Sequence, residues 1–251
     1  MLFRSDARHA AGLTEMDLDF LWTTFVRLIG GVPLTLQLAF SSIALGLALA
    51  VLLAVMMRSW FTPLAWIADG FVFVFRGTPL LVQIFLIYYG LGQFRPVLDD
   101  MGIWWFFRSP YYCALLALTL NTAAYGAEIV RGSLQSVPHG QIEAARAFGM
   151  SGFTLYRRIV APIALRQALP AYGNEIILMI KATSLCSTIT LMEVTGLAHR
   201  IISETFRSFE VFFVAGAIYL AINFAMSRLI GLAEARIAPD LDQANRPAEV
   251  H

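Results

Sequence analysis

The chain has 251 residues, of which 58% are hydrophobic and 14% are charged, and its formal net charge is +1. Soluble domains carry roughly 25% charged residues, so this chain has too few charged groups to cover a surface that faces water. The composition therefore predicts a protein that folds in lipid. The small net charge gives no sign of a nucleic-acid partner or of a strongly charged protein partner.

The first 19 residues are polar and mixed in charge, and they contain no apolar core of a signal peptide. We expect membrane insertion to be driven by the first mature helix. Residues 20–25, which include Trp22, could lie along the membrane interface. We divide the chain into a polar or interfacial N-terminal segment (1–30), a membrane domain (31–236) and a polar C-terminal tail (237–251).

Five apolar stretches are long enough to cross a bilayer, whose hydrocarbon core needs a helix of about 20 residues. In chain order they cover about residues 32–57, 64–91, 111–130, 169–191 and 211–232. The sequence therefore predicts an all-α, polytopic membrane protein with about five transmembrane helices. An odd number of spans places the two termini on opposite sides of the membrane.

Two of these stretches carry local signals. In the first, Ser42, Gly46, Ala50 and Ala54 recur at every fourth position and share one helix face. Such a face permits close helix packing in lipid, but an Ala/Gly-rich helix without an interface would look the same. In the second, the Arg-Gly-Thr-Pro sequence at 76–79 predicts a break in the helix, because proline has no N–H and glycine is flexible. Irregular backbone at membrane depth must be covered by protein or line a wet cavity.

The loop between the third and fourth spans, residues 136–170, is too polar to cross a membrane but has the composition of folded structure. Residues 141–148 are a helix-forming run with Glu143 near the start and Arg146 near the end, which suits the helix dipole. Gly149 follows, and glycine is typical of a helix C-terminus. We therefore expect a short helix outside the membrane that presents a docking surface.

This loop resembles the EAA loop of the permease subunits of ABC importers. The matching residues are Glu143, Ala144 and Ala145, then Gly149 after three residues, Ile159 after nine more, and Pro162. The family pattern ends in Leu-Pro, whereas this chain has Ala161-Pro162. In that family the loop is the coupling helix, which inserts into a groove of a cytoplasmic ATPase. The resemblance implies that residues 138–162 are the coupling loop, that Glu143 to Gly149 form the ATPase contact, and that the loop is cytoplasmic.

Further stretches resemble the polar amino acid branch of that family, and together they cover most of residues 31–236. They are PLTLQLAFSSIALG (33–46), FRGTPLLVQIFLIYYGL (75–91), LNTAAYGAEIVRGSLQSVPHGQ (120–141) and LPAYGNEIILMIKATSL (169–185). They are most similar to histidine, lysine/arginine/ornithine and opine permeases. The chain thus resembles a subunit of a binding-protein-dependent importer of basic amino acids or opines, with neutral or acidic polar amino acids such as glutamine as the alternative.

The chain has no G-x-x-x-x-G-K-[ST] sequence and no Gly-Lys pair, so we predict that it binds no nucleotide itself. The resemblance implies two ATPase subunits that bind ATP and Mg, a second permease (identical or homologous), and an external substrate-binding protein. Loop arginines divide nine to seven in favour of a cytoplasmic C-terminus in a bacterial inner membrane, with the N-terminus outside.

Ionisable and amide side chains within predicted spans are candidates for substrate contact, because they are costly in lipid unless paired or hydrated. Asn121, Tyr125 and Glu128 share one helix face. We favour Glu175 and Asn174 for substrate contact, followed by Gln83 and Asn121, then Glu128 and Lys181. A buried Glu175 would favour a cationic substrate through charge-assisted hydrogen bonds.

Each candidate has a structural alternative. Glu128 could pair with Arg131 on its own helix, and Lys181 and Glu175 could be partners between packed helices rather than ligands. Arg76 could serve the helix break, and Asp69 could be solvated near a span end.

Two other function classes fit less well. A membrane-embedded enzyme would need a nucleophile with a base, or metal ligands, at membrane depth, but the four histidines lie in predicted loops or tails and no H-E-x-x-H is present. We therefore predict no catalytic, cofactor or metal site. A passive channel would leave the docking helix without a role.

Overall fold

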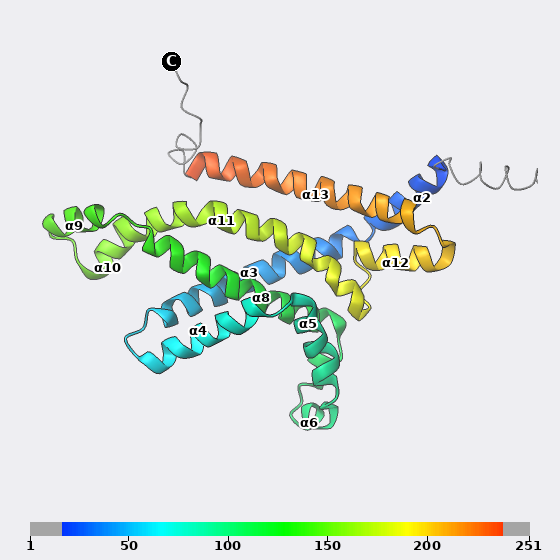
Figure 1. Cartoon of the computed structure of the whole chain (residues 1–251), viewed down its shortest axis with the longest axis horizontal. Helices are drawn as coiled ribbons and strands as arrows, with labels where there is room; N and C mark the ends of the chain where they lie inside the picture. Colours follow the sequence, from blue (N-terminus) through cyan, green and yellow to red (C-terminus); the bar gives the residue numbers. More distant parts are fainter. Residues whose placement is uncertain (1–16, 238–251) are drawn as a thin grey trace, which may run out of the picture.

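The computed structural model describes residues 17–237, and over this range it contains helices and no strand. The first half consists of α2 (Leu18–Ile29), α3 (Val32–Met57), α4 (Thr62–Gly77), α5 (Leu80–Phe85), the π-helix η1 (Leu86–Gly90), α6 (Arg95–Asp100) and α7 (Trp104–Phe107). The second half consists of α8 (Pro110–Gln135), α9 (His139–Ala147), α10 (Gly152–Leu155), the π-helix η2 (Tyr156–Val160), α11 (Ala161–Ala182), the 3₁₀ helix η3 (Thr183–Ile189), α12 (Val194–Thr205) and α13 (Ser208–Ile237). The long helices form an elongated bundle in which α8 contacts α3 and α11, and α11 contacts α13 (Figure 1).

Three helical stretches are long and apolar enough to cross a membrane as they stand: Leu18–Met57, Pro110–Gln135 and Ser208–Ile237. Two bent pairs also qualify if each is one span: Thr62–Gly77 with Leu80–Gly90, and Gly152–Ile189 with Val194–Thr205. Large apolar side chains such as Trp66, Leu220 and Leu229 are exposed on the outside of the bundle, as expected for a surface that faces lipid. The predicted all-α membrane fold with about five spans is confirmed, with three spans continuous and two broken.

The small-residue face of α3 is a packing interface with α8. Ser42, Gly46, Ala50 and Ala54 are all buried, and a Cβ built on Gly46 would lie 2.1 Å from Cγ2 of Thr122 on α8. The two helices therefore approach more closely than larger side chains would allow.

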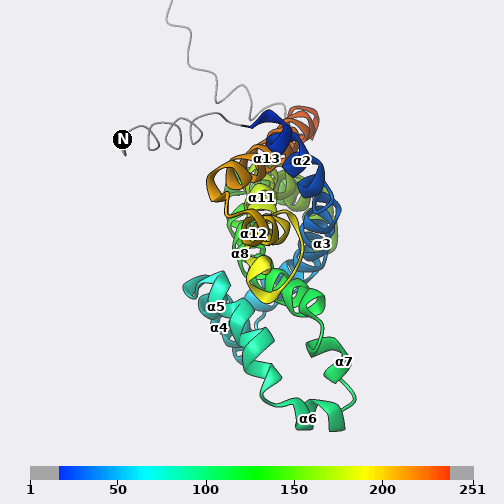
Figure 2. The same ribbon diagram turned by 90° about the vertical axis from the view of Figure 1, so that its right-hand side faces the viewer.

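The predicted break at residues 76–79 is present, and it is sharper than the sequence suggested. The axes of α4 and α5 meet at 106°, with Thr78 and Pro79 in extended conformation between them. In the interrupted span predicted over 64–91, the chain therefore turns sharply aside at the break. After η1 it runs into a small outlying hairpin of α6 and α7, which projects away from the bundle (Figure 2).

The fourth span starts earlier than predicted. The sequence placed it at 169–191 and assigned the residues before it to a loop, but α11 starts at Ala161 and includes Pro170. Arg166 is exposed and Gln167 hydrogen-bonds Ser136, so these polar side chains do not interrupt the helix.

A further correction concerns α12, which the sequence did not predict. His199 lies inside this helix and His139 is the first residue of α9, so neither lies in a loop. His9 and His251 lie outside the described residues, as do the first 16 residues of the predicted N-terminal segment and residues 238–251 of the tail.

The predicted interfacial stretch at 20–25 lies in α2, which is joined to α3 by Gly30 and Gly31. Leu28 of α2 is buried in a cluster with residues of α12 and α13. A Cβ on Gly31 would lie 2.6 Å from the backbone N of Val194, so glycine lets this junction lie directly against the start of α12.

Candidate functional site

The predicted docking helix is present as α9, at one end of the bundle together with α10 and the C-terminal end of α13 (Figure 1). Glu143 and Ala144 are exposed on it, whereas Ala145 is buried. Gly149 ends the helix with φ +80, a left-handed conformation that glycine adopts without strain. Its N–H donates to the Arg146 carbonyl oxygen (2.9 Å), and Met150 N donates to the Ala145 carbonyl oxygen (3.0 Å). The conformation at Gly149 agrees with the predicted C-terminus.

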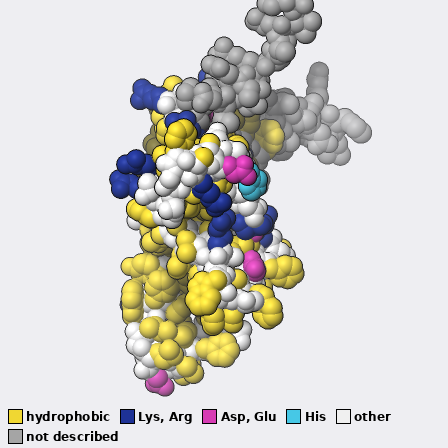
Figure 3. All heavy atoms as spheres, turned by 90° about the vertical axis from the view of Figure 1, so that its left-hand side faces the viewer, with side chains coloured by type: hydrophobic (Ala, Val, Ile, Leu, Met, Phe, Trp, Pro, Cys, Tyr) yellow, Lys and Arg dark blue, Asp and Glu magenta, His cyan; other side chains and the backbone are white. Residues whose placement is uncertain are grey.

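The rest of the loop folds back from α9 into the bundle. Ile159 is half-buried in η2, and Pro162 lies at the start of α11, which continues directly from η2. Figure 3 views this end of the molecule and shows Lys and Arg side chains above a mainly hydrophobic lower part. Arg146 of α9 and Arg157 and Arg158 of η2 belong to this end. It therefore offers an exposed short helix with cationic side chains around it.

Two of the candidate substrate residues, Gln83 and Asn121, bind each other and hold the helix break. The Gln83 amide nitrogen donates to the Phe75 carbonyl oxygen (2.8 Å) and lies within 3.1 Å of both oxygens of Thr78. Asn121 of α8 donates to the Gln83 oxygen at 3.0 Å. These bonds satisfy backbone groups that the break frees.

Glu175 and Asn174, the favoured pair, point in different directions on α11. Glu175 is 7% exposed, and its Oε1 accepts a hydrogen bond from Thr122 at 3.0 Å, whereas Asn174 is exposed. Asn121 and Thr122 are adjacent on α8, so this helix is linked through polar bonds to α5 on one side and to α11 on the other.

Glu128 pairs with Arg131, as the structural alternative proposed. Its Oε2 lies 2.5 Å from Arg131 Nη2 and 3.8 Å from Arg76 Nη1. The Arg76 guanidinium also lies 5.4 Å from the centre of the Tyr125 ring, an arrangement typical of a cation–π contact. Glu128 and Arg76 border a cavity of about 380 Å³ that Asp69 also lines.

Lys181 lines a second cavity, near the C-terminal end of α11. The alternative of a Lys181–Glu175 pair is not what the structure has, since no ion pair within residues 17–237 involves Lys181. The cavity has a volume of about 330 Å³, and we call it the Lys181 cavity. Its lining residues are Lys181, Ser184, Thr195, Phe212, Ala215, Gly216 and Tyr219.

Sequence reasoning missed Glu193, a carboxylate that is fully buried beside this cavity. Its Oε1 accepts from Gly196 N (2.8 Å), and its Oε2 accepts from Thr195 N (3.0 Å) and from the Tyr219 hydroxyl (2.6 Å). Glu193 thereby caps the N-terminus of α12, where backbone N–H groups favour a negative charge. The residue lies two positions beyond the predicted end of the fourth span, so it was not counted among the membrane residues. The signal that could have found it is an acid just before an unrecognised helix.

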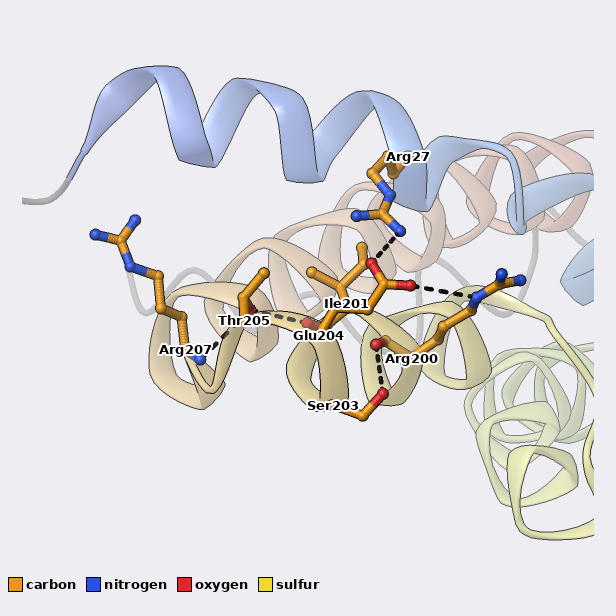
Figure 4. Close-up of polar contacts among 7 residues, drawn as sticks. All are labelled: Arg27, Arg200, Ile201, Ser203, Glu204, Thr205 and Arg207. Carbon is orange, nitrogen blue, oxygen red and sulfur yellow. Dashed lines mark hydrogen bonds and ion pairs between the residues drawn. The ribbon is translucent and has the colours of Figure 1, made fainter.

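At the end of the bundle far from α9, ion pairs join α2 to α12. Arg27 Nη2 lies 2.8 Å from Glu204 Oε2, and Arg200 Nε lies 3.4 Å from Glu204 Oε1, so the two arginines share one carboxylate (Figure 4). A further cavity of about 460 Å³ lies beside His199 and Arg200. All these side chains are exposed, and exposed ion pairs stabilise proteins weakly.

An apolar helical bundle with two broken spans, buried polar links and a short exposed helix at one end is the architecture of a membrane transport protein. Among residues 17–237, no group of three His, Cys, Asp or Glu side chains could hold a metal ion. The chain belongs to the family described as "Binding-protein-dependent transport system inner membrane component", whose model matches residues 21–239. The prediction of a transport subunit rather than an enzyme is thereby confirmed.

Curated relatives share about half of the residues along nearly the whole chain. The nopaline transport system permease protein NocM of Agrobacterium fabrum is 55% identical over 94% of this chain and 100% of its own. The octopine transport system permease protein OccM of Rhizobium meliloti is 56% identical over 92% of this chain and 94% of its own. The histidine/lysine/arginine/ornithine permease HisM of Salmonella typhimurium is 45% identical over 87% of this chain and 92% of its own. The predicted resemblance to the polar amino acid and opine branch is confirmed.

Solved structures share the fold. A chain of "Crystal structure of an amino acid ABC transporter with histidines" superposes with a TM-score of 0.79 at 34% identity, covering 89% of this chain and 100% of that one. A chain of the MetNI methionine ABC transporter superposes with a TM-score of 0.66 at 20% identity, covering 84% of this chain and 96% of that one. At 20% identity, the second similarity shows a shared fold and carries no statement about function.

Proposed function

We propose that this chain is the permease subunit of an ATP-driven, binding-protein-dependent importer of basic amino acids or of opines. The observation that carries the proposal is identity of 55–56% to nopaline and octopine permeases over more than 90% of the chain. The permease for histidine, lysine, arginine and ornithine follows at 45%. The substrates named for these relatives are amino acids or amino acid conjugates, and most carry a cationic side chain.

Energy reaches the permease through α9 in this proposal. Glu143 and Ala144 of α9 are exposed and lie at the end of the bundle that also carries Arg157 and Arg158. Two partner ATPase subunits bind ATP and Mg and dock on this helix, with Ala145, Gly149, Ile159 and Pro162 fixing its position. This places α9 in the cytoplasm, with the C-terminus on the same side and the N-terminus outside.

A second permease, identical or homologous, completes the translocation path. Exposed apolar side chains lie along α4, α5 and η1, including Phe73, Val82 and Leu86, and the broken span there supplies irregular backbone that needs cover. A closed two-fold pair of permeases would bury such a surface. An external substrate-binding protein delivers the solute to the opposite face.

The experiment that tests the proposal is uptake into proteoliposomes that hold this chain with its partner permease, its ATPase and its binding protein. Arginine, histidine, octopine and glutamine are compared with ATP and with a non-hydrolysable nucleotide. Saturable, ATP-dependent uptake of arginine, histidine or octopine is expected. Uptake of glutamine alone would contradict the substrate class, and uptake that continues without hydrolysis would contradict a pump.

A further inference from the structure

The hairpin formed by residues 92–109, which contains α6 and α7, lies to one side of the bundle. Figures 1 and 2 show that it projects across the long axis of the molecule rather than along it. It ends where α8 starts, at Pro110, and α8 has 26 residues. At about 1.5 Å per residue this helix is about 39 Å long, so both of its ends reach beyond a hydrocarbon core of about 30 Å. The hairpin therefore joins α8 at a boundary of the bilayer, on the side opposite α9.

The base of the hairpin is fixed to the bundle. The side chains of Phe107 and Tyr111 pack against a core cluster that α3, α8 and α11 share. The Tyr111 hydroxyl accepts a hydrogen bond from the Gln37 amide of α3 at 3.0 Å, and Cys113 Sγ donates to the Phe107 carbonyl oxygen at 3.2 Å. These contacts hold the end of α7 and the start of α8 together, so the bundle sets the direction in which the hairpin projects.

One face of α6 is apolar and exposed. Phe94, Val97 and Met101 follow i, i+3 and i+7 spacing and share this face, and each of them is more than half exposed. Leu98 is buried, and Asp99 lies on the opposite face of the helix. An amphipathic helix that presents its apolar face beyond the bundle is suited to an apolar neighbour rather than to water.

The aromatic side chains that follow have free polar ends. Trp105 of α7 is more than half exposed, and its ring meets the rings of Phe106 and Tyr112 edge-on, with centroids 5.8 and 5.5 Å away. Within residues 17–237, neither the indole N–H groups of Trp104 and Trp105 nor the Tyr112 hydroxyl makes a hydrogen bond. Trp and Tyr combine an apolar ring with a polar tip, and they gather at membrane–water interfaces, where the tip meets headgroups and water.

The hairpin carries no net charge, because Arg95 and Arg108 balance Asp99 and Asp100. A neutral segment creates no long-range field that would steer a charged protein domain to it. The Arg95 guanidinium lies over the Trp104 ring, 5.5 Å from its centre. Arginine stems cover apolar surface while their charged ends reach the headgroups. Exposed apolar area with an arginine at each end therefore favours the boundary of a lipid bilayer as the neighbour of the hairpin.

We propose that the α6–α7 hairpin is an interfacial anchor, which inserts Phe94, Val97, Met101 and Trp105 between the lipid headgroups and the adjoining acyl chains on the side opposite α9. Asp99 faces water in this arrangement. The anchor fixes the depth of η1, which ends the broken span, because the hairpin connects η1 to α8. The inference concerns the lipid surface and does not depend on which solute the importer carries.

Spin labels on the two faces of α6 test the anchor in the purified complex, held in lipid nanodiscs. The label is attached to Val97→Cys, Met101→Cys or Asp99→Cys, one at a time, with partner subunits that carry no reactive cysteine. Cys113 and Cys186 are buried, so the introduced cysteine reacts first. Collisions with oxygen, which concentrates in lipid, are compared with collisions with nickel ethylenediaminediacetate, which stays in water. Oxygen should prevail at positions 97 and 101, and the nickel complex should prevail at the matched control position 99.

Three results would overturn the anchor. The nickel complex prevailing at all three positions would place the hairpin in water. Few collisions with either reagent at positions 97 and 101 would show that protein, such as the second permease, covers this face. Loss of oxygen contact at these two positions only when the external binding protein is added would assign the face to that protein. The anchor predicts that addition of the binding protein leaves the oxygen collisions unchanged.

The native Trp105 gives a second readout, which needs no introduced cysteine. Fluorescence of the wild type is compared with that of Trp105→Phe, so that the difference reports Trp105 alone. Lipids brominated near the headgroup should quench this difference signal, and aqueous iodide should leave most of it. Quenching by iodide but not by brominated lipid would overturn the anchor. Neither readout requires transport, so a result against the anchor leaves the importer function untouched.

Discussion

Tyr219 donates a 2.6 Å hydrogen bond to Glu193, and this bond joins the middle of α13 to the first turn of α12. Glu193 is fully buried, so its carboxylate depends for stabilisation on its hydrogen-bond donors, which are the Tyr219 hydroxyl and the backbone N–H groups of Thr195 and Gly196. The bond therefore fixes α12 where the path of the fourth span bends by 45°.

Loss of the Tyr219 hydroxyl should destabilise the protein. Tyr219→Phe leaves an oxygen of a buried carboxylate with one donor fewer, and the expected loss is about 1–3 kcal/mol of unfolding free energy. Thermal unfolding in detergent measures it. Tyr112→Phe, at an exposed position of α8, is the control and should change stability by less than about 0.5 kcal/mol. Equal melting temperatures for the two variants would contradict a structural role of the Tyr219–Glu193 bond.

Gln83 should contribute more to stability than its partner Asn121. Gln83→Leu removes the contacts to Phe75 and Thr78 and frees the backbone at the 106° break. Asn121→Leu removes one bond to Gln83. At about 1 kcal/mol for each net hydrogen bond, the melting temperature of Gln83→Leu should be the lower of the two. The reverse order would contradict the role of Gln83 in holding the break.

Glu175→Gln tests the hypothesis that a buried carboxylate selects cationic substrates. It keeps the side-chain volume and can still accept from Thr122, so folding should be preserved. Arginine uptake should fall more than glutamine uptake, because only the cation loses a charge-assisted hydrogen bond. Thr122→Val is the companion variant, because it removes the hydroxyl that donates to Glu175 and leaves the Glu175 carboxylate in place. Equal losses for both solutes in Glu175→Gln would assign Glu175 to packing between α8 and α11.

The sequence was informative where a signal was local. The break at 76–79 and the end of α9 at Gly149 follow from residue chemistry within a few positions, and the structure places them as expected. The small-residue face of α3 was ambiguous, because only its partner Thr122, far along the chain, shows that it is an interface.

Long-range relationships could not be predicted in the same way. Whether Glu128 binds Arg131 or a substrate depends on where Arg76 lies, and whether Glu175 meets Thr122 depends on how α8 and α11 are rotated. Glu193 could not be predicted as a cap, because polar caps at membrane depth are expected only where a helix breaks. The break before α12 contains no proline, so the sequence gives no sign of it. Gln83 meets Asn121 only because the helix bends by 106° at the break. The local sequence predicts a break but not its angle, so this pairing could not be predicted.

Charge reversal on α9 should uncouple ATP hydrolysis from transport. Glu143 is exposed and its side chain forms no ion pair within residues 17–237, so Glu143→Lys should leave the melting temperature unchanged. A wrong charge in a protein interface typically costs more than about 2 kcal/mol, which corresponds to about a thirtyfold loss of docked complex. Arginine uptake into proteoliposomes should fall accordingly, while the ATPase subunits keep their basal hydrolysis.

Asp100→Lys, an equally exposed charge reversal on α6 away from α9, is the matched control and should transport normally. Normal uptake by Glu143→Lys at normal expression would exclude α9 as the ATPase contact, because a reversed charge within that contact would weaken docking.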